Sequence, residues 1–438
     1  MKRHTFILLV GALILCLSSA THAQKDQQPA AKAAKIAAIA VTGTQKFPTD
    51  QILAAAGIKT GDVVTAQQVQ EAADRLAALG LFSTVNFHYT AKDDGIVLSF
   101  ELKDAPTFPL SFDNFPWFQD RELADAIRAD VGLFTGETPD NGAMIDEITI
   151  VLEKLLASKK IKGNVTHQLL AQPAGDAMMM QFRVEGATLR VQSVKFGDSL
   201  AAESERLKDR ISDVKGQPYS RFAIDVFENE QVRPLYAAKG FLRAEIGPPQ
   251  PRLIADANTP AEPGVDLLIP IVPGTAYAWK GASWRGNMAF TSTVLDGDFG
   301  LKPGDVADGM KIESEWQRIE SEYTRHGYLD VRINKQPQFD EAARQVSYNV
   351  EIAEGPQYRM GEMIVTGLSI DAEKRLRRIW QMAPGQIFDN GYYETITKEL
   401  VKPTPAVFGE MPVHYIEFGH FLRPDPDRHT VDVLLDFK

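Results

Sequence analysis

The stretch RHGYLDVRI, residues 325–333, decides the fold because the same arrangement recurs at two earlier places in the chain. AKGFLRAEI occupies residues 238–246, and ALGLFSTVNF occupies residues 78–87. Each copy has a glycine, then an aromatic residue or leucine, then the alternation typical of a half-buried strand. Because glycine can end a helix in a left-handed conformation without steric cost, the three copies predict the same helix-to-strand transition.

A second set of glycines, farther upstream in each copy, extends the repeat to five. Each of these glycines is followed four residues later by a residue type that caps helix N-termini well. The pairs are Gly61 with Thr65, Gly136 with Asp140, Gly216 with Ser220, Gly304 with Asp308 and Gly385 with Asp389. Helical patterns follow the caps, such as the apolar stripe of Ile312, Trp316, Ile319 and Tyr323. The second copy has Lys160 at the place where Gly240 ends the helix of the third.

The repeating unit reads as strand, helix, helix, strand, strand. Closing strands such as QVSYNVEIAEG (345–355) are followed by a new short strand such as GEMIVTG (361–367). The sequence therefore predicts an α+β fold of five tandem β-α-α-β-β modules in an elongated array. Each module is expected to have a three-stranded mixed sheet with two helices on one face. The expected modules are residues 35–105, 106–186, 187–274, 275–355 and 356–438.

The N-terminus is typical of an exported protein. Two cations, an apolar run from Phe6 to Leu17 and the sequence Thr-His-Ala predict a signal peptide, residues 1–23, with cleavage after Ala23; residues 24–34 are a predicted flexible linker. The run is shorter than the roughly 20 apolar residues of a membrane-spanning helix. Cys16, the single cysteine, lies in the predicted signal. A net charge of -11 disfavours nucleic-acid binding.

These residues resemble tandem POTRA (polypeptide-transport-associated) domains from about residue 35 to 438. The glycine signature, the closing Glu-Gly dipeptides at 185–186 and 354–355, and Val-Thr-Gly at 41–43 and 365–367 carry the resemblance. In the BamA family of outer membrane protein assembly factors, five such modules form a periplasmic arm that continues into a barrel. Here HTVDVLLDFK ends at Lys438, and even a small barrel needs on the order of 80 residues in its strands. We therefore expect an array without a barrel.

An enzyme is disfavoured by the sequence. It contains no hydrolase, zinc-protease, phosphate-loop or dinucleotide motif. The segment HYIEFGH (414–420) brings two histidines near Glu417, but positions three apart on a strand face opposite sides. We predict no catalytic residue, no metal and no cofactor.

Binding has a mechanism, because an edge strand presents unpaired backbone groups that can accept another strand. The resemblance implies that the strand after the second helix lies at the edge, at residues 82–89, 162–169, 242–246, 329–333 and 413–418. Two irregular stretches, the proline-rich 247–264 and the insertion 401–412, are expected to be loops. The candidate partner-binding residues are Phe82, Thr84, Asn86, His88, Leu242, Ala244, Leu329, Val331, Val413 and Tyr415.

The resemblance also implies the partners and the location. We expect unfolded or partly folded outer-membrane proteins, a membrane β-barrel subunit or its accessory proteins, met in the periplasm at the inner face of the outer membrane. Two alternatives remain at this stage. One is a purely structural envelope spacer without client binding, and the other is the arm of a split or truncated barrel insertase.

Overall fold

A computed structural model of the chain describes residues 33–438 except 174, 188, 255–263, 410 and 412. The predicted signal peptide lies outside the described residues. Contacts divide the described chain into two compact units, one with residues up to 110 and 121–155, the other with 111–120 and 156–438. No described helix is long and apolar enough to cross a membrane.

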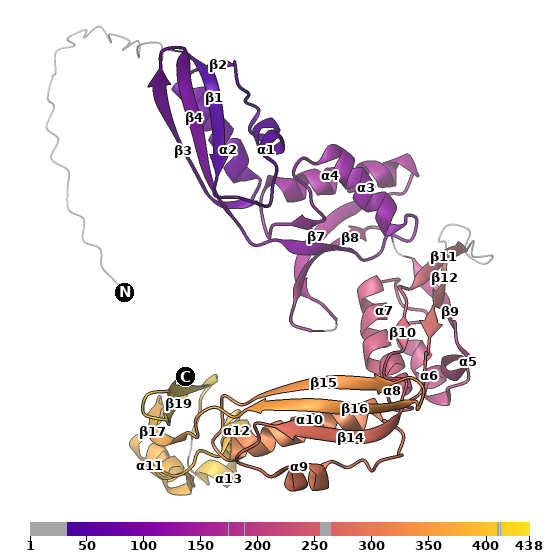
Figure 1. Cartoon of the computed structure of the whole chain (residues 1–438), viewed down its shortest axis with the longest axis vertical. Coiled ribbons are helices and arrows are strands. Elements are labelled where there is room, and N and C mark those ends of the chain that lie inside the picture. The colour runs from indigo at the N-terminus through magenta and orange to yellow at the C-terminus, as the bar shows by residue number, and fades with distance from the viewer. Residues whose placement is uncertain (1–32, 174, 188, 255–263, 410, 412) are drawn as a thin grey trace, which may run out of the picture. The chain divides into compact units, whose positions relative to one another are not determined.

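The first segment is a four-stranded sheet with two helices against one face (Figure 1). β1 runs parallel to β4, and β3 pairs antiparallel with β4 at the edge. Thr65 caps α2 through a capping box with Gln68, as predicted. The elements are β1 (Ala34–Thr42), α1 (Thr49–Ala56), β2 (Val63–Val64), α2 (Ala66–Ala78), β3 (Phe82–Lys92) and β4 (Gly95–Asp104).

The second segment keeps the same element order. β5 pairs with β6, and β7 pairs antiparallel with β8 over eight residues. Its elements are β5 (Phe108–Phe112), α3 (Asp120–Asp130), β6 (Glu137–Thr138), α4 (Ala143–Ser158), β7 (Asn164–Ala171) and β8 (Met178–Glu185). The predicted cap at Asp140 is wrong, because α4 begins three residues later. The Asn141–Gly142 turn packs instead against Leu79 and Gly80.

The third segment departs most from the expectation. Its main sheet has the order β11-β12-β9, with β10 and β13 forming a separate two-stranded sheet. The edge strand β11 lies within residues 247–264, which the sequence predicted to be a loop. The elements are β9 (Arg190–Phe196), α5 (Ser199–Ala202), α6 (Glu205–Arg210), η1 (Ile211–Asp213), α7 (Arg221–Phe227), η2 (Glu228–Val232), α8 (Arg233–Ala237), β10 (Glu245–Ile246), β11 (Gln250–Ile254), β12 (Gly264–Ile269) and β13 (Ile271–Val272).

The fourth and fifth segments share one topology. In each, the first strand runs parallel to the last, and the remaining strand pairs antiparallel at the edge. The predicted stripe of Ile312, Trp316, Ile319 and Tyr323 is buried on α10, which lies against one face of its sheet (Figure 1). The elements are β14 (Ala278–Arg285), α9 (Ser292–Asp298), α10 (Gly309–Arg325), β15 (Arg332–Asp340), β16 (Gln345–Ala353), then β17 (Arg359–Thr366), α11 (Ile370–Ile379), α12 (Asn390–Leu400), α13 (Pro405–Phe408), β18 (Phe418–Asp425) and β19 (Thr430–Phe437).

The five upstream glycines have one structural role. All have positive φ, from 80° to 105°, which favours glycine. In every segment the residue two positions later pairs with the first strand: these residues are Val63, Thr138, Pro218, Val306 and Ile387. The turn between the two helices therefore forms an extra strand or a single bridge, which is why the first and second sheets have four strands instead of the expected three.

Candidate functional site: exposed edge strands

The edge strand of the first segment, β3, is the longest candidate. It is an 11-residue strand that ends the order β2-β1-β4-β3, so no other described strand pairs with its outer edge. Three of the candidate partner-binding residues, Thr84, Asn86 and His88, lie on this strand and are exposed. Phe82 is only 6% exposed and meets Phe47 edge-on, with ring centroids 5.6 Å apart. The Phe82 side chain is therefore core, and only its backbone remains for pairing.

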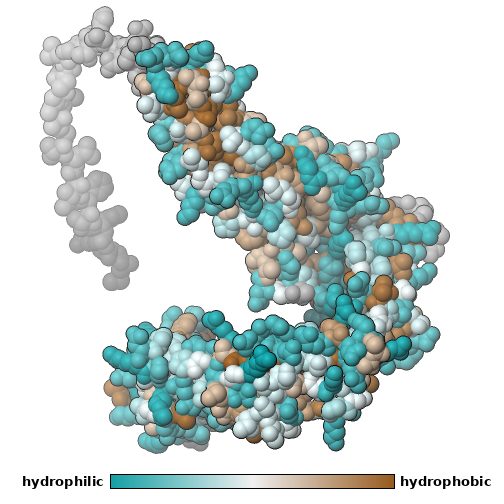
Figure 2. Space-filling model, viewed as in Figure 1, coloured by the Kyte–Doolittle hydropathy of each residue, from teal (hydrophilic) through white to brown (hydrophobic). Residues whose placement is uncertain are grey.

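The other face of β3 carries a row of apolar side chains. Phe87 lies opposite the buried Phe100, with ring centroids 6.3 Å apart. Tyr89 lies opposite the buried Leu98 but is itself 52% exposed. A strand added beside β3 would therefore meet apolar groups on one face and polar groups on the other. Figure 2 shows hydrophobic residues gathered over β1 and β4 of this sheet. Ala38 and Ala40 on β1 are exposed.

Proline distinguishes the edge strands from one another. β11, β15 and β18 contain Pro251, Pro337 and Pro424 respectively, whereas neither β3 nor β7 contains proline. Proline in an edge strand removes an N–H from the outer side, which blunts the edge against further pairing. These three prolines are visible in the sequence itself. They leave β3 and β7 as the strands best suited to accept a partner.

Six of the ten predicted site residues are not on strands. Leu242, Ala244, Leu329, Val331, Val413 and Tyr415 all precede the strands to which they were assigned. In the third segment the edge strand begins only at Gln250, and in the fourth and fifth at Arg332 and Phe418. The predicted strand starts were therefore several residues too early.

The displaced residues have a packing role instead. Phe241 packs against the hydrophobic core of the third segment (the third core), whereas Leu242, next in the chain, packs against that of the fourth segment (the fourth core). Likewise Tyr328 packs against the fourth core and Leu329 against the fifth. The glycine–aromatic–leucine signature thus joins the third core to the fourth and the fourth core to the fifth.

The remaining displaced residues belong to the core of their own segment. Ala244 packs against the third core and Val331 against the fourth. Val413 and Tyr415 pack against the fifth, where the Tyr415 hydroxyl donates to the Leu400 carbonyl at 2.6 Å. None of these residues presents a free strand edge.

The junction glycines allow the close approach of successive segments. Gly240 and Gly327 have φ near 82°. Their carbonyls accept hydrogen bonds from the amides of Tyr277 and Tyr358, at 2.9 and 2.8 Å. Lys160 adopts the same left-handed region, with φ of 59°, in the second segment.

A buried carboxylate connects the second and third segments by hydrogen bonds. Asp113, 3% exposed, accepts hydrogen bonds from the Ser220 hydroxyl at 2.8 Å and the Phe222 amide at 2.9 Å. Arg221 pairs with Asp120 at 2.5 Å. Sequence reasoning missed Asp113, because a lone aspartate after a strand carries no distinguishing pattern.

The histidine segment 414–420 forms no metal site. The described residues of the chain contain no group of three His, Cys, Asp or Glu side chains placed to hold a metal ion. Glu417 and His414 are exposed, and the Tyr393 hydroxyl lies 2.7 Å from His420 Nδ1. His420 is thus part of an aromatic cluster with Tyr393 and Phe418.

Comparison with known proteins agrees with the repeat. The POTRA family, described as a surface antigen variable number repeat, matches residues 34–104 and 277–355. Residues 34–104 and 277–355 are therefore POTRA domains, and the chain is similar to BamA-like assembly factors.

Two curated relatives, both outer membrane protein assembly factors by their names, match half of this chain or more. A putative outer membrane protein assembly factor of Treponema pallidum is 21% identical over 61% of this chain and 31% of its own length. The outer membrane protein assembly factor BamA of Buchnera aphidicola is 20% identical over 50% of this chain and 36% of its own length. The matched region spans about a third of these relatives.

Solved structures of similar proteins include the POTRA3-5 region of Haemophilus influenzae BamA. It is 17% identical, covers 57% of this chain and 96% of that one, and has a TM-score of 0.44. POTRA1-3 of the periplasmic domain of Omp85 from Anabaena is 15% identical, covers 74% and 96%, and has a TM-score of 0.22.

Proposed function

We propose that this chain is an exported, periplasmic array of five POTRA modules that binds unfolded or partly folded outer-membrane proteins by strand addition. The module boundaries proposed are those expected from the sequence. The array acts at the inner face of the outer membrane, together with a membrane β-barrel subunit, and it binds rather than catalyses.

The observation that carries this proposal is the edge of β3. It offers 11 residues of backbone without proline. Two residues of this strand, the half-buried Phe87 and the exposed Tyr89, form an apolar row on one face. Main-chain hydrogen bonds are indifferent to the side chains of a client. The apolar row on one face selects clients whose side chains alternate between apolar and polar, as strands of outer-membrane barrels do.

The test measures binding of a labelled, end-blocked peptide of about ten alternating residues to the chain from residue 24 to 438, by fluorescence anisotropy. Tyr89→Lys places a charge beside the apolar row without opening the core, and we expect binding to weaken by about tenfold. The matched control is Phe421→Lys, which changes a similarly exposed aromatic, 62%, on the proline-containing β18. It should leave the affinity unchanged.

A rigid spacer is the competing function, and the segment junctions are its support. Gly240, Gly327 and Asp113 all join neighbouring segments by hydrogen bonds. A spacer is expected to have no measurable affinity for the peptide. If the chain does not bind the peptide, the client-binding proposal is wrong and the spacer function replaces it. An equal loss in Tyr89→Lys and Phe421→Lys would contradict the assignment to β3.

A further inference from the structure

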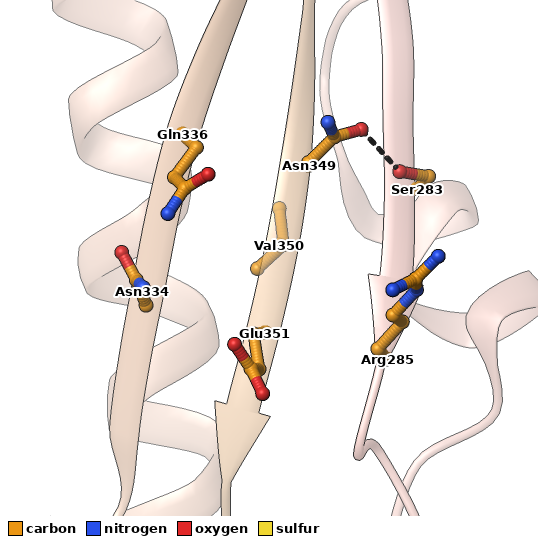
Figure 3. A pocket seen from close by; sticks show the side chains of 7 residues that line it. All are labelled: Ser283, Arg285, Asn334, Gln336, Asn349, Val350 and Glu351. Carbon is orange, nitrogen blue, oxygen red and sulfur yellow. Dashed lines mark hydrogen bonds between the residues drawn. The ribbon is translucent and has the colours of Figure 1, made fainter.

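The outward face of the fourth sheet carries an ordered set of polar side chains. Two cross-strand rows run over β14, β16 and β15, in the registers Ser283–Asn349–Gln336 and Arg285–Glu351–Asn334. They line a shallow depression of about 210 Å³. Figure 3 shows these side chains standing on three neighbouring strands. The face is largely hydrophilic in Figure 2, unlike the sheet of the first segment.

The hydrogen-bonding groups of this face are mostly unused. The Ser283 hydroxyl donates to the side-chain oxygen of Asn349 at 2.9 Å (Figure 3). Within the described part of the chain, the side chains of Asn334, Gln336, Arg285 and Glu351 make no hydrogen bond or ion pair. Each amide side chain offers N–H donors and a carbonyl acceptor, so it can pair with both the C=O and the N–H of a peptide unit.

The spacing of the amides matches an extended chain. Asn334, Gln336 and Gln338 alternate along β15, so they share one face and recur about every 6.6 Å. An extended polypeptide lying along the strand presents its own N–H and C=O groups with the same two-residue repeat. Pro337 removes a donor from the edge of β15, which makes strand addition at this edge unfavourable.

We propose that this amide face, defined by Asn334, Gln336 and Asn349, binds the main chain of an extended polypeptide through side-chain amides. Arg285 and Glu351 lie at one end of the track and are free to pair with a charged client side chain of either sign. The inference rests on the proposed function for its class of ligand, an unfolded polypeptide. It adds a site that works without strand addition and lies in a different module from β3.

The test uses the chain from residue 24 to 438 and the same end-blocked peptide, in the background of Tyr89→Lys. The triple change Asn334→Ala, Gln336→Ala and Asn349→Ala should weaken the remaining affinity by about tenfold. Gln336→Glu keeps the size and the acceptors but removes the donors, and should weaken binding by a few-fold. The matched control, Gln67→Ala with Gln70→Ala, removes two exposed amides from α2 and should change nothing.

The outcomes separate this inference from the proposed function. If Tyr89→Lys weakens binding and the triple change adds nothing, the amide face is not a site and the β3 proposal stands. If the triple change acts and Tyr89→Lys does not, the amide face stands and the β3 proposal fails. A peptide N-methylated at alternate residues should bind the amide face less well. Competition by a chito-oligosaccharide, with no loss on N-methylation, would overturn the inference in favour of a glycan site.

Discussion

A β-carbon placed on Gly327 would lie 2.5 Å from the carbonyl oxygen of Tyr358, while the Tyr358 amide donates to the Gly327 carbonyl at 2.8 Å. Two backbones from successive segments thus meet where only glycine fits. This contact explains why the glycine–aromatic–leucine signature recurs at residues 240–242 and 327–329: the glycine joins two successive segments, and the leucine packs against the core of the following one.

Gly327→Ala should therefore open this junction. The alanine β-carbon would clash with the Tyr358 carbonyl, and alanine would have to adopt a left-handed backbone. We therefore expect the free energy of local unfolding at the junction to fall by about 2–4 kcal/mol. Amide exchange at Tyr358 measures it directly. Gly304→Ala is the matched control: φ is 96° there, but nothing lies within 4 Å of its β-carbon. It should cost only the backbone strain, about 1–2 kcal/mol, and equal effects would contradict a junction role.

Lys160→Gly should stabilise the second segment. Lys160 has φ of 59°, a conformation that costs a side-chain-bearing residue about 1–2 kcal/mol, partly offset by the greater chain entropy of glycine. We expect a net gain of about 0.5–1 kcal/mol in the free energy of unfolding. Urea denaturation of the two proteins tests it. Lys162→Gly, at an exposed lysine without positive φ, is the control and should not stabilise the segment. An unchanged or lower midpoint for Lys160→Gly would show that the lysine side chain compensates for the strain.

Glu228 should make the third segment less stable as pH rises. Burial raises its pKa to about 8, from 4.5 in an exposed carboxyl, and the side chain is 7% exposed. Between these values the folded chain holds a proton that the unfolded chain has lost, so the free energy of unfolding falls with rising pH across this window. Asp225, one turn away, has a pKa raised by burial to about 6 and acts in the same direction.

Glu228→Gln should remove most of this dependence and stabilise the segment at pH 8 by on the order of 2 kcal/mol. Amide exchange of α7 at pH 5.5 and pH 8, corrected for intrinsic rates, gives the measurement. Glu230→Gln, at an exposed neighbour, should retain the wild-type dependence. A pH dependence that survives in Glu228→Gln would locate the responsible proton elsewhere.

The sequence predicts the α+β layering well because caps and apolar stripes are local signals. Thr65, Ser220, Asp308 and Asp389 all cap helices as expected. Strand starts were predicted less well. Leu329 lies two residues after the junction glycine, in a stretch whose apolar and polar residues alternate as in a strand. Its side chain nevertheless packs against the core of the following segment. A pattern within one segment does not reveal that contact.

The candidate site was only partly predictable. Thr84, Asn86 and His88 lie on the free edge of β3, as expected, because the alternation there is long and uninterrupted. The edge strand β11 was missed, because Pro248, Pro249 and Pro251 are typical of a loop. The two strands that lack proline stand out only when all five edges are compared.

The most direct test of the central claim is amide hydrogen exchange across β3, with and without a saturating client peptide of alternating apolar and polar residues. We predict slower exchange at the backbone amides of residues 82–92 that face away from β4, a smaller effect on β7, and none on β18, where Pro424 blunts the edge. Unchanged exchange along β3 while the peptide is bound would contradict strand addition.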